Sequence, residues 1–537
     1  MNGNKKQFLE IDALFKKWNT IDSPGCSLGV IRNGEFLYES NYGIRNLESK
    51  KPITSETLFD IASVSKQFTA ACIALLILKD KLSLNCFLND ILSEVKLEHK
   101  ITIGQLIYQE SGIKDFQYSL FMLNNIWEDI ESLLAKQLLS FINKLPQLDF
   151  TPGNQHHYSN TNYFLLGLIV KQITGKSLAD FAEQEIFSKL GMKNTFFYEN
   201  FSEIKSRNVA IGYSLRDNSY KVNIPNAWVV GPRGVFTTID DLLLWDQNFY
   251  TLKVGGKEFI ELLEKPSQEK ISGLSTNRWN NPLFHQGYAF GLLTDYYRGE
   301  KIIRHGGGHG GYTAEILRFP KKQLTINILT NNGSINPTTL AFKIADILLD
   351  NEFQDKSPYT WSSFKHISEE EVNACLGVYY EARFNEYYSI SRENGKLILE
   401  NDWMKSELKA ITSDTLIAIN NSGLFLVRPK ENKIIIENEF YSAEISKCEP
   451  IVLEKNQIIE YTGNYLNEQF NHKIQITAEK DKLKFNLKVG VQILKSISKD
   501  TFRNDFLQLE FHRKNKAISF VKVNSAGSKG ITYNKVI

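Results

Sequence analysis

The feature that most constrains the fold is an internal repeat in the last third of the chain. Residues 376–399 and 462–485 align without a gap at an offset of 86, and 8 of the 24 positions are identical. The identical pairs are Gly377/Gly463, Tyr379/Tyr465, Phe384/Phe470, Asn385/Asn471, Ile390/Ile476, Glu393/Glu479, Lys396/Lys482 and Leu397/Leu483. Each copy has short β-type runs separated by turns, and its length suits a small closed barrel. We predict antiparallel β-barrel domains over 369–450 and 451–537; the alternative is two unrelated β stretches that share common residues.

The part of the chain before the repeat has a different pattern. Two β-type runs in 26–48 surround Asn33-Gly34, a dipeptide that favours a tight hairpin turn. Strand patterns return in 288–332, and an apolar helix pattern over 338–349 follows. We therefore expect an α+β domain over residues 1–352, with a sheet built from both of its ends and helices from its middle. Residues 353–368 lose periodicity, and we interpret them as a linker.

Composition and charge exclude several classes of function. The formal net charge is only +2, and no basic block with interleaved aromatic residues occurs, which argues against nucleic-acid binding. The longest clean apolar run is Ala70–Leu78, far short of the roughly 20 residues of a membrane span. The N-terminus lacks the apolar core of a secretory signal, so we expect a cytoplasmic protein if Met1 is the true start. The five cysteines form no C-x-x-C pair, which favours reduced thiols in cores over a zinc site.

The tetrad S-x-x-K occurs nine times, and context singles out the copy at Ser63. The segment Phe59–Asp80 reads FDIASVSKQFTAACIALLILKD, so Ser63 stands where an apolar helix should begin. Lys66 would lie on the same helical face, and first-turn N–H groups have no intrahelical partners. A nucleophilic serine needs such a proton acceptor and such an oxyanion site. The alternative is an ordinary N-cap serine followed by a solvated lysine.

Two further short motifs stand at helix or strand boundaries. Tyr158 and Asn160, two residues apart, follow a Pro-Gly turn and precede an apolar helix, so both can face one cleft. The alternative there is a turn with a partly buried tyrosine. The glycine-rich segment 302–320, IIRHGGGHGGYTAEILRFP, matches neither a phosphate-binding loop nor a dinucleotide-binding turn. Glycines after a strand indicate a bulge or a close approach of another backbone.

Taken together and in this order, SVSK, YSN and HGG resemble the active-site motifs of the serine β-lactamase and penicillin-binding protein superfamily. The resemblance covers roughly residues 8–352 and is to the branch with class C β-lactamases, D-aminopeptidases, D-Ala-D-Ala carboxypeptidases and related esterases. It implies the β-lactamase/DD-peptidase fold, in which helices surround an antiparallel sheet. The two β modules resemble the lipocalin-like barrels that follow the catalytic domain in D-aminopeptidases.

The resemblance also implies roles for residues of the first two motifs. Ser63 would be the nucleophile and form an acyl-enzyme. Lys66 and Tyr158 would share proton transfer, and Asn160 would bind the substrate's amide. No cofactor and no metal are expected.

The third motif would complete the site. The oxyanion hole would be formed by the N–H groups of Ser63 and Gly308, while Gly307 would keep the strand edge open for the substrate backbone. His305 stands where many relatives place a lysine, and a histidine is mostly neutral at pH 7. We therefore expect an activity optimum on the alkaline side of neutrality. Arg233 stands where relatives often have a glycine-rich turn. Its side chain could narrow the cleft, bind a carboxylate or be solvated.

The expected function is that of a serine hydrolase acting on D-configured peptides or amides, most similar to a D-aminopeptidase. The alternatives are a carboxylesterase on the same scaffold, then a β-lactamase or penicillin-binding protein, then a non-catalytic binding protein. The expected partners are small peptide, amide or ester substrates, not nucleic acid or membrane. The barrels could also mediate homo-oligomerisation.

Overall fold

The computed structural model describes 2–123, 135–145, 148–198, 207–224, 229–267, 285–353, 368–381, 386–401, 404–410, 415–420, 423–430, 432–437, 442–448, 453–487, 490–504, 507–525 and 528–536. The chain forms two compact units. The first contains Met1–Ser111, Pro152–His156 and Thr161–Ser357. The second contains Gly112–Thr151, His157–Asn160 and Pro358–Ile537. Most of the linker expected at 353–368 lies outside the described residues, and the domain boundaries stay predictions.

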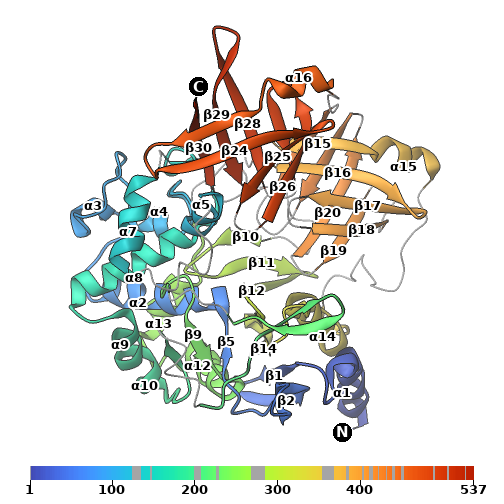
Figure 1. Cartoon of the computed structure of the whole chain (residues 1–537). Helices are drawn as coiled ribbons and strands as arrows, with labels where there is room; N and C mark the ends of the chain where they lie inside the picture. Colours follow the sequence, from blue (N-terminus) through green and yellow to red (C-terminus); the bar gives the residue numbers. More distant parts are fainter. Residues whose placement is uncertain are drawn as a thin grey trace. The chain divides into compact units, whose positions relative to one another are not determined.

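The first unit contains a seven-stranded antiparallel sheet that joins the two ends of the expected α+β region (Figure 1). Its strands, in spatial order, are β10 (His285–Tyr288), β11 (Leu293–Tyr297), β12 (Glu300–His309), β13 (Tyr312–Phe319), β14 (Leu324–Thr330), β1 (Cys26–Arg32) and β2 (Glu35–Tyr42). The expected hairpin joins β1 to β2, with positive φ at Asn33 (55°) and Gly34 (78°). Two positive φ values suit the tight turns that match strand twist.

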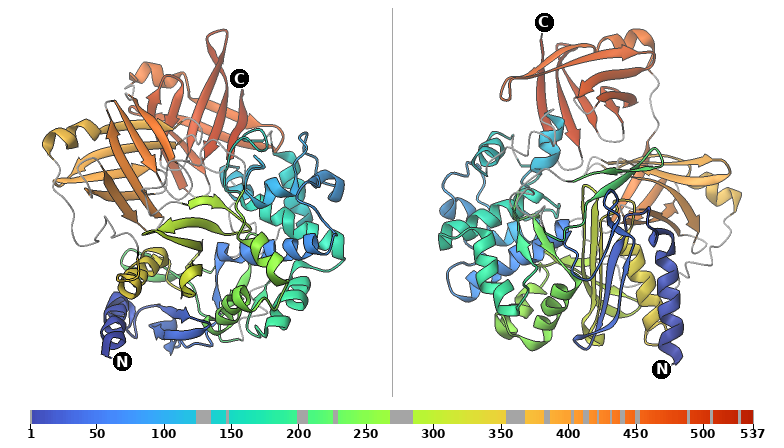
Figure 2. Two further views of the ribbon diagram at one scale, coloured as in Figure 1. Left: turned by 180° about the vertical axis from the view of Figure 1, so that it is seen from behind. Right: turned by 60° about the horizontal axis from the view of Figure 1, so that its bottom comes forward.

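Helices cover both faces of this sheet, as the right panel of Figure 2 shows. On one face α1 (Asn2–Phe15) and α14 (Pro337–Leu349) pack against each other, and α14 contacts β13 and β14. On the other face α12 (Ile239–Thr251) contacts β1 and β14. Other α-helices among the described residues are α2 (Lys66–Leu78), α3 (Leu88–Ile91), α4 (Ile103–Ile107), α8 (Asn160–Thr174, whose first residue belongs to the second unit), α9 (Leu178–Ala182), α10 (Ser188–Leu190) and α13 (Gly256–Leu263). No helix among the described residues is long and apolar enough to cross a membrane.

A short turn positions the SVSK motif. The 3₁₀ turn η2 (Ala62–Ser65) precedes α2, so the α-helix starts at Lys66 and not at Ser63 as expected. Before η2, β5 (Phe59–Asp60) pairs with β9 (Val235–Thr237), which also pairs with β6 (Phe196–Phe197). The body of α2 is buried on nearly every side, which explains its uniformly apolar sequence. The turn that carries Ser63 is therefore attached directly to a rigid, buried helix.

The second unit contains two closed eight-stranded barrels, as the repeat predicts. The first barrel is built from β15 (Gly377–Glu381), β16 (Glu386–Glu393), β17 (Lys396–Asn401), β18 (Met404–Ala410), β19 (Leu416–Asn420), β20 (Gly423–Lys430), β21 (Lys433–Glu437) and β22 (Ser442–Cys448). The second is built from β23 (Gly463–Asn467), β24 (His472–Glu479), β25 (Lys482–Leu487), β26 (Gly490–Ser498), β27 (Thr501–Arg503), β28 (Gln508–Lys514), β29 (Ala517–Ser525) and β30 (Ser528–Val536). Every strand pairs with its sequence neighbour, and the last strand pairs with the first.

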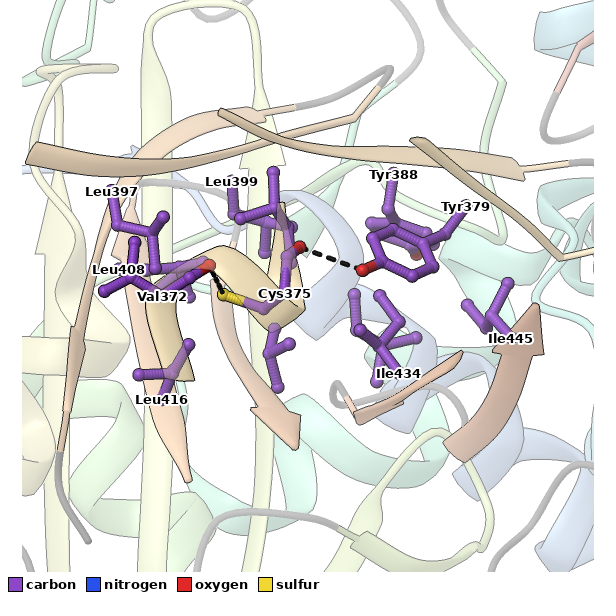
Figure 3. Packing of buried hydrophobic residues seen from close by; sticks show 14 of the residues in the cluster. Val372, Cys375, Tyr379, Tyr388, Leu397, Leu399, Leu408, Leu416, Ile434 and Ile445 are labelled. Carbon is purple, nitrogen blue, oxygen red and sulfur yellow. Dashed lines mark hydrogen bonds between the residues drawn. The ribbon is translucent and has the colours of Figure 1, made fainter. Parts of the chain in front are cut away.

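The repeat extends to helices that precede the barrels, α15 (Glu369–Cys375) and α16 (Lys455–Ile459). Tyr379 is fully buried and donates a hydrogen bond to the carbonyl of Cys375 at 2.9 Å, drawn in Figure 3. Its counterpart Tyr465 donates to the carbonyl of Tyr461 at 2.7 Å. In the first copy the bond satisfies the last carbonyl of α15, where backbone carbonyls lack partners, and in the second it satisfies a carbonyl two residues beyond the end of α16. This shared device explains why tyrosine is identical in the two copies.

Candidate active site

Ser63 and Lys66 come together as the motif predicts. The Nζ atom of Lys66 donates to the Oγ atom of Ser63 at 3.2 Å and to the carbonyl of Pro232 at 2.8 Å. The ring of Tyr163 lies 5.7 Å from Nζ, measured to its centroid. Lys66 is fully buried, whereas Ser63 is partly exposed. The pair thus has the geometry of a nucleophile with its proton acceptor, and Lys66 is not the solvated lysine of the alternative.

Strand β12 contacts the turn η2, which carries Ser63 and is called the serine turn below, at Gly307. A Cβ atom at this position would lie 2.4 Å from the carbonyl oxygen of Ile61 and 3.0 Å from the backbone nitrogen of Ser63. Any side chain would therefore push the strand and the turn apart. The glycine cluster marks a close approach of two backbones, as the sequence indicates.

Beyond Arg304, the edge of β12 beside the turn has no paired strand among the described residues. Strand β11 pairs with β12 only as far as Leu293↔Arg304, whereas β13 pairs through His309↔Tyr312. Along an antiparallel strand, residues that are hydrogen-bonded to the neighbouring strand alternate with residues that are not. His309 and Tyr312 flank a two-residue loop and form a hydrogen-bonded pair, so Gly308 is at a non-hydrogen-bonded position. Gly308 therefore directs its N–H away from β13, to the edge that β11 no longer covers. A Cβ at Gly308 would meet nothing within 4 Å. This geometry suits the predicted oxyanion donor.

His305 shares with Gly307 the face of β12 that contacts the serine turn, because side chains alternate along a strand. It is 4% exposed; its Nδ1 bonds the carbonyl of Gly306 at 2.5 Å and its Nε2 lies 3.5 Å from the hydroxyl of Tyr288. Burial and the positive charge of Lys66 lower the pKa of His305 to about 3. The imidazole is therefore neutral at pH 7, which supports the premise of the alkaline optimum; the optimum itself stays a prediction.

A buried network at the serine turn escaped the sequence analysis. Asp60 accepts hydrogen bonds from the backbone N–H of Ala62 at 2.7 Å and from the hydroxyl of Tyr198 at 3.1 Å. It also lies 3.2 Å from the Nδ1 of His309. Ala62 has a φ of 47°, an unfavourable conformation for a residue with a side chain. Asp60 thus stabilises the strained backbone immediately before Ser63. The one feature of the sequence that could have pointed to this network is His309, the second histidine of the segment HGGGHGG.

Arg233 belongs to this network and is not solvated. The side chain is 5% exposed, and its guanidinium hydrogen-bonds the Nε2 of His309. Burial and the charge of Arg233 lower the pKa of His309 to about 4, so that the ring is neutral at pH 7. The solvated alternative was wrong because the turn at Gly231–Gly234 folds inward. The same turn supplies the Pro232 carbonyl to Lys66.

Tyr158 and Asn160 belong to the second unit. Asn160 is the first residue of α8, and its backbone N–H and its Nδ2 donate to the carboxylate of Asp115 at 2.7 and 2.9 Å. The apolar helix expected after the YSN motif is α8. The meeting of these two residues with Ser63 stays a prediction from the motif.

Three of the five cysteines are unsuited to act as nucleophiles. Burial raises the pKa of the Cys26 and Cys72 thiols well above the usual range and that of Cys375 to about 11. Such thiols stay protonated at neutral pH and behave as apolar core groups. Within the described ranges, no cluster of three or more histidine, cysteine or acidic side chains could hold a metal ion.

Comparison with known proteins identifies the family. The family model described as Beta-lactamase matches residues 11–345, more than half of the chain. The chain belongs to the β-lactamase family. Members are generally serine hydrolases, which agrees with the Ser63–Lys66 geometry. The expected α+β fold and the two barrels that follow it are confirmed.

Named relatives are similar at low identity. Protein flp of Staphylococcus aureus strain MW2 is 27% identical over 321 residues, covering 58% of this chain and 60% of the relative. A D-aminopeptidase of Brucella anthropi is 27% identical over 337 residues, covering 61% of this chain and 59% of the relative. The chain thus spans about three fifths of these curated relatives. An octameric penicillin-binding protein homologue from Pyrococcus abyssi has a similar fold, with a TM-score of 0.59 and 23% identity over 82% of this chain and 99% of its own.

Proposed function

We propose that this protein is a serine hydrolase that cleaves peptides or amides of D-configured amino acids through an acyl-enzyme on Ser63. The observation that carries the proposal is the 3.2 Å contact between the buried Lys66 amine and the partly exposed Ser63 hydroxyl. The D-aminopeptidase relative, the neutral His305 in place of a lysine and the two barrels support this substrate class.

In the proposed acylation step, the Oγ of Ser63 attacks the substrate carbonyl carbon, and its proton passes to the base formed by Lys66 and Tyr158. The carbonyl π electrons move to oxygen, where the N–H groups of Ser63 and Gly308 stabilise the negative charge. Collapse of this intermediate breaks the bond to the leaving amine, which takes up a proton relayed through Lys66 and Tyr158. Asn160 would hold the substrate during these steps.

In the proposed deacylation step, a water molecule attacks the ester carbon of the acyl-enzyme and transfers its proton to the base formed by Lys66 and Tyr158. The Ser63 oxygen leaves and regains a proton, and the free acid is released. A neutral His305 gives this base less electrostatic support than a second cation would.

The test is release of p-nitroaniline from D-alanyl-p-nitroanilide, with the L-isomer and p-nitrophenyl acetate measured alongside. Wild-type protein should turn over the D-isomer in preference, and Ser63→Ala should lose a factor of about 10³ or more. Turnover of the ester alone would replace the proposal with a carboxylesterase. Undiminished turnover by Ser63→Ala would overturn the proposed nucleophile.

A further inference from the structure

A single buried carboxylate of the second unit binds the start of one helix and the backbone of Asn160, which lies in the same unit. Asp115 is 1% exposed and precedes α5 (Phe116–Met122). Its Oδ1 accepts from the backbone N–H groups of Gln117 at 2.8 Å and Tyr118 at 3.3 Å. Its Oδ2 accepts from the backbone N–H of Asn160, the first residue of α8, at 2.7 Å. A negative charge at a helix N-terminus is stabilising.

The same contacts fix the orientation of the Asn160 amide. Its Nδ2 donates to the carboxylate of Asp115 at 2.9 Å and to the Oε1 of Gln117 at 2.8 Å. Both partners are acceptors, so the NH₂ group must face them and the Oδ1 atom must face the other way. In the proposed site, Asn160 would therefore turn its Oδ1 atom, and not its NH₂ group, toward a substrate. That polarity suits a substrate N–H or ammonium group.

Helix α5, which carries Asp115 at its start, is attached to the last strand of the second barrel. The hydroxyls of Ser119 and Ser528 are hydrogen-bonded at 2.8 Å, and both side chains are fully buried. The Ser119 hydroxyl also lies 2.8 Å from the carbonyl of Asp115. One turn further along, the hydroxyl of Tyr533 lies 3.5 Å from the carbonyl of Met122. Strand β30 thus contacts α5 at two places.

Lys529, the residue after Ser528 in β30, provides a second connection, which leads through Asp149 to Lys114 beside Asp115. The backbone N–H of Lys529 donates to the Oδ1 of Asp149 at 3.2 Å. Asp149 forms an ion pair with Lys114, and the two side chains are only 3% and 4% exposed. The backbone N–H of Asp149 also donates to the carbonyl of Gly112 at 2.8 Å. The residue next to Asp115 is therefore tied to the same barrel strand.

We propose that the second barrel is a working part of the substrate site, because β30, through Ser119 and Asp149, holds Asp115 in the position that orients Asn160. This inference rests on the proposed function, since it takes Asn160 as a substrate-binding residue. Asp115, Ser119 and Ser528 are then positioning residues. The barrel acts on substrate binding through the protein interior, with no need for a barrel loop to touch the substrate.

The test uses full-length protein with the variants Asp115→Asn, Ser528→Ala and Ser528→Thr. Ser496→Ala is the matched control, because Ser496 is a buried serine of the same barrel whose hydroxyl lies 3.3 Å from the carbonyl of Ser498, within β26. For D-alanyl-p-nitroanilide, Asp115→Asn should lower kcat/KM about 10- to 100-fold and Ser528→Ala about fivefold. Ser528→Thr keeps the hydroxyl and should stay within about twofold of wild type, as should Ser496→Ala. For p-nitrophenyl acetate, which has no N–H, the losses should be smaller.

Amide hydrogen exchange over residues 157–163 gives a readout that does not depend on catalysis. Asp115→Asn and Ser528→Ala should speed exchange in this segment, and Ser496→Ala should not. Wild-type activity in both variants, or exchange as slow as in wild type, would overturn the inference. If wild type hydrolyses none of the substrates, the proposed function fails, and the exchange result still decides whether the barrel holds residues 157–163 in place.

Discussion

Replacing Gly307 by alanine should impair catalysis through a single methyl group. The new Cβ would lie 2.4 Å from the carbonyl oxygen of Ile61 and 3.0 Å from the nitrogen of Ser63. Ordinary contacts of this kind begin near 3.4 Å, so the strand and the serine turn must separate by about 1 Å. A misplacement of that size can cost roughly 10²-fold in rate, or about 2.7 kcal/mol in the activation barrier.

The assay is kcat/KM for D-alanyl-p-nitroanilide, with the melting temperature measured to detect unfolding. Gly308→Ala is the steric comparison, because its Cβ would meet nothing within 4 Å and its backbone N–H remains. We expect a far smaller loss there than at Gly307. A Gly307→Ala variant that is folded and within threefold of wild type would refute the idea that β12 positions the nucleophile.

Two further predictions concern buried ionisable groups. The pKa of His305 is lowered to about 3, so the unfolded chain binds a proton below pH 6.5 that the folded protein excludes, and stability falls as the pH drops from 6.5 towards 3. Urea unfolding at several pH values measures how steeply the free energy of unfolding depends on pH. Between pH 3 and 6.5, His305→Gln should reduce this slope by up to about 1.4 kcal/mol per pH unit. An unchanged slope would contradict a buried neutral histidine. Lys114→Met leaves the carboxylate of Asp149, 3% exposed, without its ion-pair partner and should cost about 3–5 kcal/mol. Adding Asp149→Leu should recover part of that stability, and a double variant less stable than the single one would show that charge burial is not the cause.

The repeat and the apolar helix were predictable because they depend on local pattern. Tyr379 and Tyr465 are identical since each donates to a backbone carbonyl four residues earlier, at or just after the end of the preceding helix, and such an equivalence leaves a signal in the sequence. Ser63 stood out among the S-x-x-K tetrads because an uninterrupted apolar helix follows it. Its placement on a 3₁₀ turn was not predictable, since the turn depends on Asp60 holding Ala62 in a left-handed conformation.

Long-range polar contacts were beyond the sequence analysis. Asp115 precedes Asn160 by 45 residues and Ser119 precedes Ser528 by 409, so no periodicity links either pair. Arg233 has the composition of a surface residue, and only the inward fold of its turn buries it against His309. Such residues act through tertiary contacts, which single-sequence patterns do not contain.

The most direct test of the central claim is to trap the acyl-enzyme. The protein is quenched in acid during turnover of a D-alanyl ester and digested, and the peptides are examined by mass spectrometry. We predict a D-alanyl adduct on the peptide that contains Ser63, and none in the Ser63→Ala variant. An adduct on another residue, or turnover that survives Ser63→Ala, would contradict the account.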